Sequence, residues 1–167
     1  INDDIFLKIN EYLLQQNTKL SNGGSAGNAI RALAHLDSCT GFIGKIGNDL
    51  YGQFFRKELK KLSIEDKLLV SAERPSGVAS TFISEGGERT FATFLGAAAT
   101  LLPEELTPEM FKDYTYLFIE GYLVQDHDLI LQAIELAKRE GLQVCLDMAS
   151  YNIVEENLEF FKLLLSK

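Results

Sequence analysis

The chain has 167 residues, of which 46% are hydrophobic and 24% are charged, a composition that supports a packed core and excludes wholesale disorder. Its net charge of −8 argues against a nucleic acid or an anionic membrane as the partner. No apolar stretch approaches the ~20 residues of a membrane-spanning helix, and Cys39 and Cys145 are too far apart to suggest a disulfide framework or a zinc knuckle. These features predict an acidic, soluble, cytoplasmic protein with one domain over residues 1–167.

The first third of the chain combines helical periodicity with glycine-rich turns. Weak helical periodicity covers residues 9–16, and Ser25 is expected to cap a helix over residues 26–36. The expected inner face of that helix carries Ala29, Leu33 and Leu36. An apolar run at residues 40–46 predicts a buried strand, and residues 49–62 predict an amphipathic helix with Lys and Arg in its last turns, where they suit the negative end of the helix dipole.

Strand-like sequence begins near residue 67 and includes a hairpin. Residues 68–70, Val78–Ile83 and Arg89–Phe94 are rich in Val, Thr, Phe and Ile, so each predicts a strand. The last two are joined by residues 85–88, which contain two glycines and predict a hairpin loop. Alternate residues give this ribbon one more apolar face. Because a two-stranded ribbon is marginally stable alone, we expect it to cover a pocket or to contact a second copy.

Strands and helices alternate again after Pro108. Strands are expected at residues 116–119 and 142–146, a helix is expected at residues 126–140, and residues 154–165 are expected to be mostly helical. Strands that alternate with helices of this length predict an α/β fold, in which a mostly parallel sheet is flanked by helices and a single antiparallel ribbon departs from it.

The segment Gly23-Gly24-Ser25-Ala26-Gly27-Asn28 has the composition of a ligand-binding turn. Glycines directly before a helix let the backbone approach a ligand closely, at the positive end of the helix. The amide of Asn28, one turn into the helix, can both donate and accept a hydrogen bond, which suits a ligand with vicinal hydroxyls. A tight turn followed by an N-cap is the alternative. The spacing matches neither the dinucleotide-binding nor the Walker pattern.

Other loops follow predicted strands, at the edge where parallel sheets bind ligands. In the loop over residues 41–52, Asp49 is expected to cap the next helix. Glu120-Gly121-Tyr122 follows a second strand. Asp147 follows a third strand and is expected to cap a helix beginning near Tyr151, with a pocket-facing role as the alternative.

The two histidines do not support a metal site or a catalytic triad, because neither has a Ser, a Cys or a second His at a useful spacing. His35 is expected against the core or the surface of its helix. His127 lies beside Asp126 and Asp128 and is expected to be solvated. No metal-binding residues are predicted.

Together these segments resemble the ribokinase-like, or PfkB-type, carbohydrate kinase family, near its adenosine-kinase-like branch. The resemblance rests on the glycine pair and Asn28, on Phe42-Ile43-Gly44-Lys45-Ile46-Gly47-Asn48-Asp49 with Gly52, and on Gly87-Glu88-Arg89-Thr90 in the hairpin. It runs over nearly the whole chain. The resemblance implies a mostly parallel sheet between helices, with a small β lid over the substrate, and transfer of the γ-phosphoryl group of ATP to a hydroxymethyl group of a sugar or nucleoside.

The resemblance also implies roles for individual residues. Gly23, Gly24 and Asn28 would bind the sugar hydroxyls, and Arg89, in a lid ribbon at about residues 78–94, would contact the substrate or phosphate. ATP and Mg²⁺ are the implied cofactors, and a small sugar or nucleoside is the implied partner. The same ribbon would pair two copies in a homodimer. An Asp that holds sugar hydroxyls in the family would precede Ile1 or fall at Asp3 or Asp4.

One element of the family is absent from these 167 residues. The family's Gly-Ala-Gly-Asp element, which supplies the anion hole and the catalytic base, does not occur. We therefore expect no catalytic residue in this chain, which would be the N-terminal half of a kinase, incomplete on its C-terminal side and inactive alone. A non-catalytic sugar- or nucleoside-binding module is the alternative function, and an inactive structural fragment is a further one.

Overall fold

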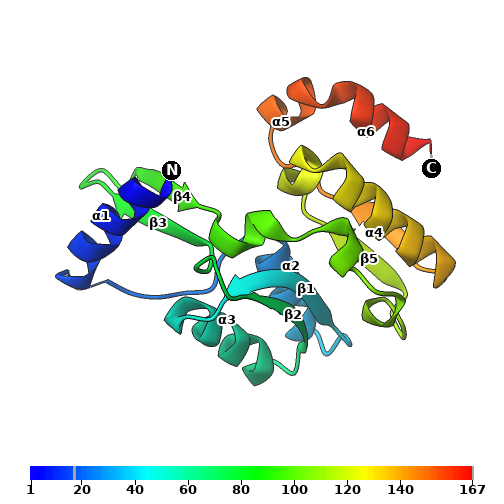
Figure 1. Cartoon of the computed structure of the whole chain (residues 1–167), viewed down its shortest axis with the longest axis horizontal. Coiled ribbons are helices and arrows are strands. Elements are labelled where there is room, and N and C mark those ends of the chain that lie inside the picture. The colour runs from blue at the N-terminus through cyan, green and yellow to red at the C-terminus, as the bar shows by residue number, and fades with distance from the viewer. Residues whose placement is uncertain (17, 167) are drawn as a thin grey trace. The chain divides into compact units, whose positions relative to one another are not determined.

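A computed structural model describes residues 1–16 and 18–166 of the chain (Figure 1). The chain forms two compact units, Ile1–Thr100 and Leu101–Lys167. The expectation of one domain over the whole length stays a prediction, and each unit is described by itself below.

The first unit is built on a parallel strand pair with a crossover helix. Strand β1 (Gly41–Gly47) leads into α3 (Leu50–Lys61), which returns to β2 (Glu65–Ser71). The two strands pair in parallel, with Gly41 opposite Glu65 and Gly47 opposite Ser71. Helix α3 lies against this pair through Leu59, which is fully buried. Asp49, the predicted cap, accepts a hydrogen bond from the Gly52 N–H at 2.8 Å and starts the helix.

Helix α1 (Asp3–Leu14) starts earlier than the periodicity of residues 9–16 predicts. Asn2 caps it by accepting a hydrogen bond from the Ile5 N–H at 3.0 Å. Its buried residue, Phe6, stacks on Phe94 with ring centroids 4.2 Å apart. The helix is therefore stabilised by a contact with a distant part of the chain, which no local pattern shows.

Helix α2 (Ser25–Ala34) precedes β1, and the hairpin of β3 (Val78–Ile83) and β4 (Arg89–Phe94) follows β2. The bounds of both hairpin strands are as predicted. They pair antiparallel from Val78 opposite Phe94 to Ile83 opposite Arg89. A 3-10 helix, η1 (Gly96–Thr100), closes the unit.

The second unit repeats the parallel arrangement. Strand β5 (Tyr116–Ile119) and strand β6 (Gln143–Leu146) pair in parallel, and α4 (His127–Arg139) connects them. Helices α5 (Tyr151–Glu156) and α6 (Leu158–Leu165) follow, and short 3-10 turns cover Pro103–Glu105, Pro108–Met110 and Gly121–Gln125. The core of this unit consists of apolar side chains from β5, α4, α5, α6 and the turn after β5: Ile119, Val124, Ile130, Ile134, Ile153, Phe160, Phe161 and Leu164.

The predicted fold class is confirmed: parallel strands are joined and covered by helices, and one antiparallel ribbon stands apart from them. Residues 154–165 are mostly helical, as predicted. They belong to two helices, because the chain bends at Asn157, whose side-chain amide donates to the Ile153 carbonyl at 3.0 Å. One local expectation is wrong: Leu33 and Leu36, expected on an inner face, are 44% and 75% exposed.

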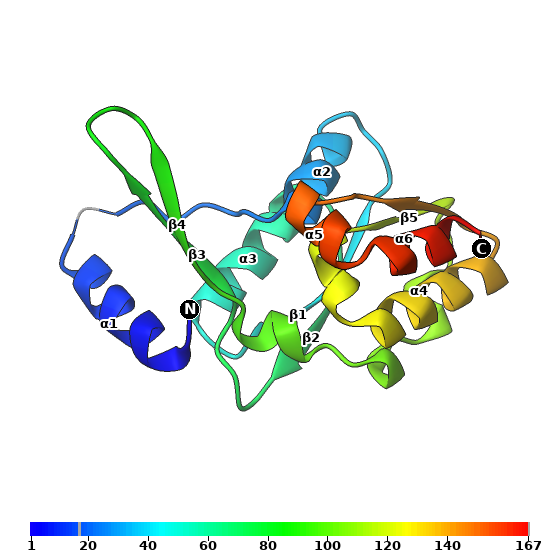
Figure 2. The ribbon, with the colours of Figure 1, turned by 90° about the horizontal axis from the view of Figure 1, so that it is seen from above.

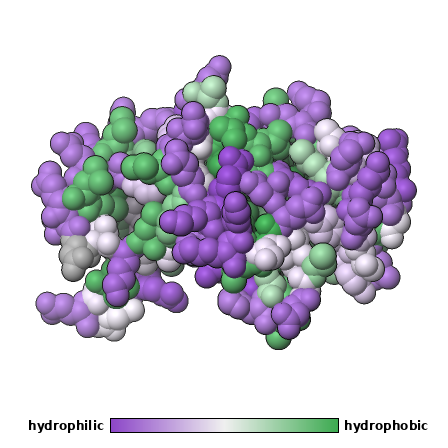
Figure 3. All heavy atoms as spheres, turned by 90° about the horizontal axis from the view of Figure 1, so that it is seen from below, coloured by the Kyte–Doolittle hydropathy of each residue, from purple (hydrophilic) through white to green (hydrophobic). Residues whose placement is uncertain are grey.

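Large apolar side chains reach the surface at many points in both units. Figure 3 shows hydrophobic atoms among hydrophilic ones on the face seen from below. Among the described residues, every helix is too short or too polar to cross a lipid bilayer.

Candidate functional site

The glycine pair forms the turn that starts α2. Gly24 is at the N-cap position with φ +87°, a backbone conformation that L side chains rarely adopt, and this explains glycine there. The helix begins at Ser25 itself, so Ser25 is not the N-cap, contrary to the prediction. A Cβ added at Gly23 would meet no atom within 4 Å, so the backbone there is open to an approaching group.

Asn28 lies one turn along α2 and is exposed. Its backbone N–H donates to the Gly24 carbonyl at 2.9 Å, which fixes Asn28 directly above the turn. The structure therefore places Gly23, Gly24 and Asn28 together at one exposed helix N-terminus. A backbone open to approach and a side-chain amide that donates and accepts are the groups that can hold a hydroxylated ligand.

Asn22, which sequence reasoning passed over, precedes the glycine pair. Both polar atoms of its side-chain amide are buried and have no hydrogen-bond partner. Its backbone carbonyl accepts from Arg31 at 3.5 Å. A buried amide without a partner is costly, and such an atom beside an open turn is a candidate ligand contact. The sequence carries no signal for it, because an Asn before two glycines is also a common turn residue.

Asp49 does more than cap α3. Its Oδ1 accepts from the Ser76 hydroxyl and its Oδ2 from the Ser76 N–H, each at 2.7 Å. Burial raises the pKa of Asp49, but hydrogen bonds from Gly52, from the N–H and hydroxyl of Ser76 and from Tyr51 outweigh it, so the net pKa lies below its ordinary value. The half-buried carboxylate is thus stabilised in its ionised form by groups of the chain itself.

The glycines around Asp49 allow close packing of backbone. A Cβ on Gly52 would lie 2.4 Å from the Gly47 carbonyl oxygen, and one on Gly47 would lie 2.6 Å from the Ser76 nitrogen. The Gly-x-Asp-x-x-Gly spacing of the sequence is therefore a packing requirement at the end of β1.

Arg89 begins β4 and pairs with Ile83 across the hairpin. It is exposed, as are all residues from 81 to 91. Figure 2 shows the loop of the ribbon projecting from the rest of the first unit, away from the start of α2. The structure thus groups three of the four predicted site residues and leaves Arg89 apart from them; its role stays a prediction.

The more apolar ribbon face that alternation predicts is present. Val78, Ser80, Phe82, Thr90, Ala92 and Phe94 share one face by their register. Ser80 and Phe94, near the base, are buried. The opposite face is exposed throughout and includes Phe91 at 57% exposure.

In the second unit, the loops after β5 and β6 pack on each other. A Cβ on Gly121 would lie 2.2 Å from the Asp147 carbonyl oxygen. Asp147 accepts from the Ala149 N–H at 3.1 Å, and Ser150 holds the N-cap position of α5. The expectation that Asp147 caps this helix is therefore wrong: its carboxylate closes the local turn.

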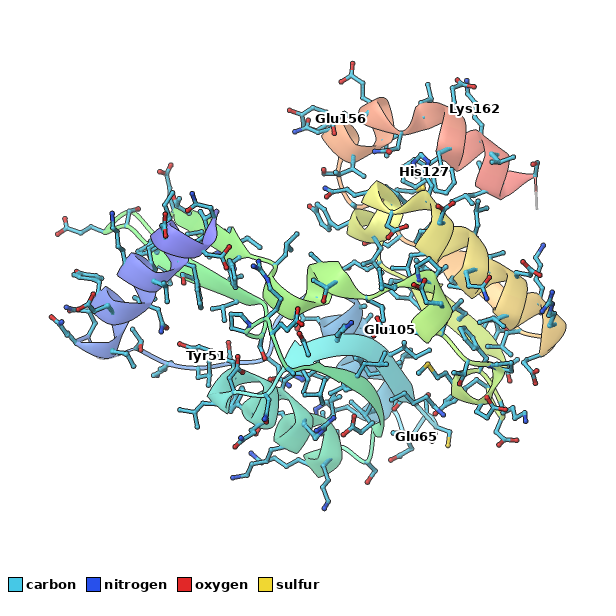
Figure 4. All side chains as sticks on the ribbon, in the orientation of Figure 1. Tyr51, Glu65, Glu105, His127, Glu156 and Lys162 are labelled. Carbon is cyan, nitrogen blue, oxygen red and sulfur yellow. The ribbon has the colours of Figure 1, made fainter. Side chains whose placement is uncertain are left out.

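His127 is exposed, as expected, but its ring also stacks on Phe160 with centroids 3.6 Å apart. Its Nε2 lies 3.3 Å from Asn157 Oδ1. Figure 4 shows His127 between α4 and α6. His35, at the C-terminus of α2, is exposed. Within the described ranges, no three His, Cys, Asp or Glu residues are grouped so as to hold a metal ion.

Two hollows are lined by residues outside the glycine turn. One, of about 400 Å³, is lined by His127, Phe160 and residues 155–159. The other, of about 350 Å³, lies between Ile1–Asp3 and the base of the ribbon. The second lining includes Asp3, one of the positions considered for the Asp that holds sugar hydroxyls. Neither lining includes Gly23, Gly24, Asn28 or Arg89. Cys39 and Cys145 are free and exposed.

Comparisons with known proteins identify relatives across most of the chain. A 5-dehydro-2-deoxygluconokinase of Listeria monocytogenes is 31% identical over 133 residues, which are 75% of this chain and 41% of the relative. A ribokinase of Staphylococcus aureus is 27% identical over 156 residues, 89% of this chain and 51% of the relative. The crystal structure of adenosine kinase from Sinorhizobium meliloti matches with a TM-score of 0.82 and 26% identity, over 98% of this chain and 51% of that one.

The chain thus spans about half the length of these relatives. The pattern that defines the pfkB family of carbohydrate kinases matches residues 2–159. That match covers both units and includes the glycine pair, Asn28, the Asp49 loop and the ribbon. The chain therefore belongs to the pfkB family of carbohydrate kinases.

Proposed function

We propose that this chain forms the substrate-binding and lid half of a kinase that transfers the γ-phosphoryl group of ATP to a hydroxymethyl group of a sugar or nucleoside. The observation that carries the proposal is the open glycine turn with Asn28 above it, in a chain that belongs to a family of carbohydrate kinases. ATP is abundant in the cytoplasm, which is the location we propose.

The glycine turn is the proposed acceptor site. Gly23 leaves its backbone free to approach a sugar ring, and the positive end of α2 favours oxygen atoms there. The Asn28 amide would donate to one hydroxyl and accept from its neighbour. Two adjacent hydroxyls satisfy both atoms at once, which favours a ribose-like or fructose-like acceptor.

The ribbon is the proposed lid. At its base one face is buried, at Ser80 and Phe94, and its outer half is exposed on both faces, which is the distribution expected for an element that closes on a ligand. Arg89 would then contact the acceptor or its phosphate after the ribbon moves. Such a movement excludes water from the reacting groups.

The cofactor elements are proposed to lie outside these 167 residues. The described residues offer no cluster of metal ligands, and the sequence has no Gly-Ala-Gly-Asp. These residues therefore do not fit ATP and Mg²⁺ by themselves. Phosphoryl transfer depends on positioning and on stabilisation of charge, so the chain by itself is expected to be inactive.

We also propose that the ribbon joins two copies. Phe91 and Ile83 lie exposed on the face opposite Phe94, and among the described residues no third strand pairs with the ribbon. Light scattering of the full-length protein tests this directly: Phe91→Ser should shift a dimer toward monomer. An unchanged mass would rule out the ribbon as the contact.

The acceptor site is tested by Asn28→Ala in the full-length protein. Loss of the amide leaves hydroxyls of the bound ligand unpaired, which should cost about 1–3 kcal/mol, or roughly 5–150-fold in kcat/KM. Asn152→Ala is the matched control, because Asn152 is also exposed in the first turn of a helix. ATP consumption should be measured with ribose, fructose, adenosine and 5-dehydro-2-deoxygluconate.

The outcomes separate the candidate functions. Equal kinetics of the parent and Asn28→Ala would remove Asn28 from the site. Binding of an acceptor by calorimetry, without ATP consumption, would favour the non-catalytic binding module, for which the missing Gly-Ala-Gly-Asp is the supporting observation.

A further inference from the structure

The segment that enters the ribbon and the segment that leaves it lie side by side. Ser76 lies two residues before β3, and Gly96 lies two residues after β4. The Ala97 N–H donates to the Pro75 carbonyl at 2.7 Å. Gly96 has φ +52°, and a Cβ there would lie 2.2 Å from the Pro75 oxygen. The chain entering the ribbon and the chain leaving it are therefore in direct backbone contact.

Asp49 connects the segment that enters the ribbon to β1 and α3. The Ser76 hydroxyl donates to Asp49 Oδ1 and accepts from the Gly47 N–H at 2.9 Å, while the Ser76 N–H donates to Asp49 Oδ2. The Gly52 N–H also donates to Oδ1. Ser76 is only 3% exposed. Hydrogen bonds to a carboxylate are stronger than those between neutral groups, so this is a strongly held junction.

A second N-cap in the chain shows that capping a helix does not by itself require hydrogen bonds from a distant segment to the capping carboxylate. Asp126 caps α4 by accepting from the Leu129 N–H at 2.9 Å, and it is exposed. Asp49 performs the same capping with Oδ1, which also accepts from the Ser76 hydroxyl, and its Oδ2 accepts from the Ser76 N–H. The additional bonds serve the segment that enters the ribbon.

We propose that Asp49 is a positioning residue for the ribbon: with Ser76 it fixes the base of the ribbon on β1 and α3, so that the ribbon moves as a lever about an immobile base. The exposed half, residues 81–91, is free to swing, while residues 76–78 and 94–97 stay in place. The fixed base is a property of the chain itself; its effect on catalysis rests on the proposed function of the ribbon as a lid.

Asp49→Asn and Asp49→Ser test the junction in the full-length protein. Both Asn and Ser are good N-caps, so α3 keeps its start. Asn presents an NH₂ group where the Ser76 N–H needs an acceptor, and Ser has one oxygen in place of two. Ser76→Ala removes the hydroxyl from the other side. Asp126→Asn is the matched control, because it changes an N-cap charge without any link to the ribbon.

The primary measurement is amide hydrogen exchange without any ligand. We expect exchange at residues 76–78 and 94–97 to rise about tenfold or more in each junction variant, as for a lost hydrogen bond to a charged group. Exchange within α3 should change little, and Asp126→Asn should leave the ribbon as in the parent. Equal acceleration in α3 and at the ribbon base would make Asp49 only a helix cap and overturn the proposal, as would unchanged exchange at the base.

The kinetic measurement is separate. In the junction variants, KM for the acceptor should rise at least severalfold while KM for ATP stays constant. If the ribbon base loosens but the parent protein consumes no ATP with any acceptor, the junction stands and the proposed kinase function fails. If the parent is active and the base does not loosen, the proposed function stands and the junction proposal fails.

Discussion

Gly52→Ala is expected to destabilise the first unit, although alanine is the better helix former. A Cβ at this position would lie 2.4 Å from the Gly47 carbonyl oxygen and 2.8 Å from Ser76 Oγ. The first of these is a backbone atom, which cannot rotate away. Gly52 and Gly47 must therefore separate, and this weakens the bond from the Gly52 N–H to Asp49.

The magnitude follows from three contributions. Overpacking costs about 1–3 kcal/mol, and a weakened hydrogen bond to a carboxylate costs about 1.5–3 kcal/mol. The higher helix propensity of alanine offsets at most about 1 kcal/mol of this loss of stability. The net loss is about 2–4 kcal/mol, which for a chain of this size lowers Tm by roughly 5–15 °C.

Thermal unfolding followed by circular dichroism measures this loss, with Gly23→Ala as the matched variant. A Cβ at Gly23 meets no atom within 4 Å, so that substitution should leave Tm unchanged or raise it slightly. If Gly52→Ala unfolds at the same temperature as the parent, the close approach at the end of β1 is not the constraint argued above. If Gly23→Ala unfolds much earlier, the turn before α2 is packed and not open.

Two more predictions concern the polar side chains of Asp49 and Asn22. Because hydrogen bonds hold the pKa of Asp49 below its ordinary value, its stabilisation is fully present above the unfolded pKa, near 3.9, and is lost as pH falls through the folded pKa. Asp49→Asn should therefore lower stability at pH 7, and in urea titrations that difference should shrink as the pH falls below about 3.9; a difference that grows in acid would contradict this sign. Asn22→Ala should cause no loss of stability, because it removes a buried amide without a partner, yet it should weaken acceptor binding in a calorimetric titration. A large loss of stability would show that the amide is satisfied.

The sequence predicts elements well where the pattern is local. Both hairpin strands and β5 have the predicted bounds, because β-branched and aromatic runs end at glycines or polar turns. The cap at Asp49 is also local. The position of helix α1 does not follow from a local pattern, because it depends on Phe6 stacking on Phe94.

The candidate site is predictable only in part, for the same reason. The glycine pair and Asn28 are neighbours along the chain, so their grouping follows from the helix alone. Ser76 is a buried serine in a loop between two strands, and its pairing with Asp49 joins segments 27 residues apart. The burial of the side-chain amide of Asn22 depends on other segments of the chain. The position of Arg89 depends on how far the ribbon projects from the rest of the first unit. None of these has a periodic signal.

The two free cysteines provide a way to observe movement. Cys39 follows α2 in the first unit, and Cys145 lies in β6 of the second; both are exposed. Exposed thiols react through their thiolate form, so a maleimide dye or spin label can reach one position in each unit without substitution. Resonance energy transfer between two such labels would report the separation of the units as ligand is added. The same thiols can cross-link copies in air, so a dimer that disappears on reduction is a disulfide between chains and not a ribbon contact.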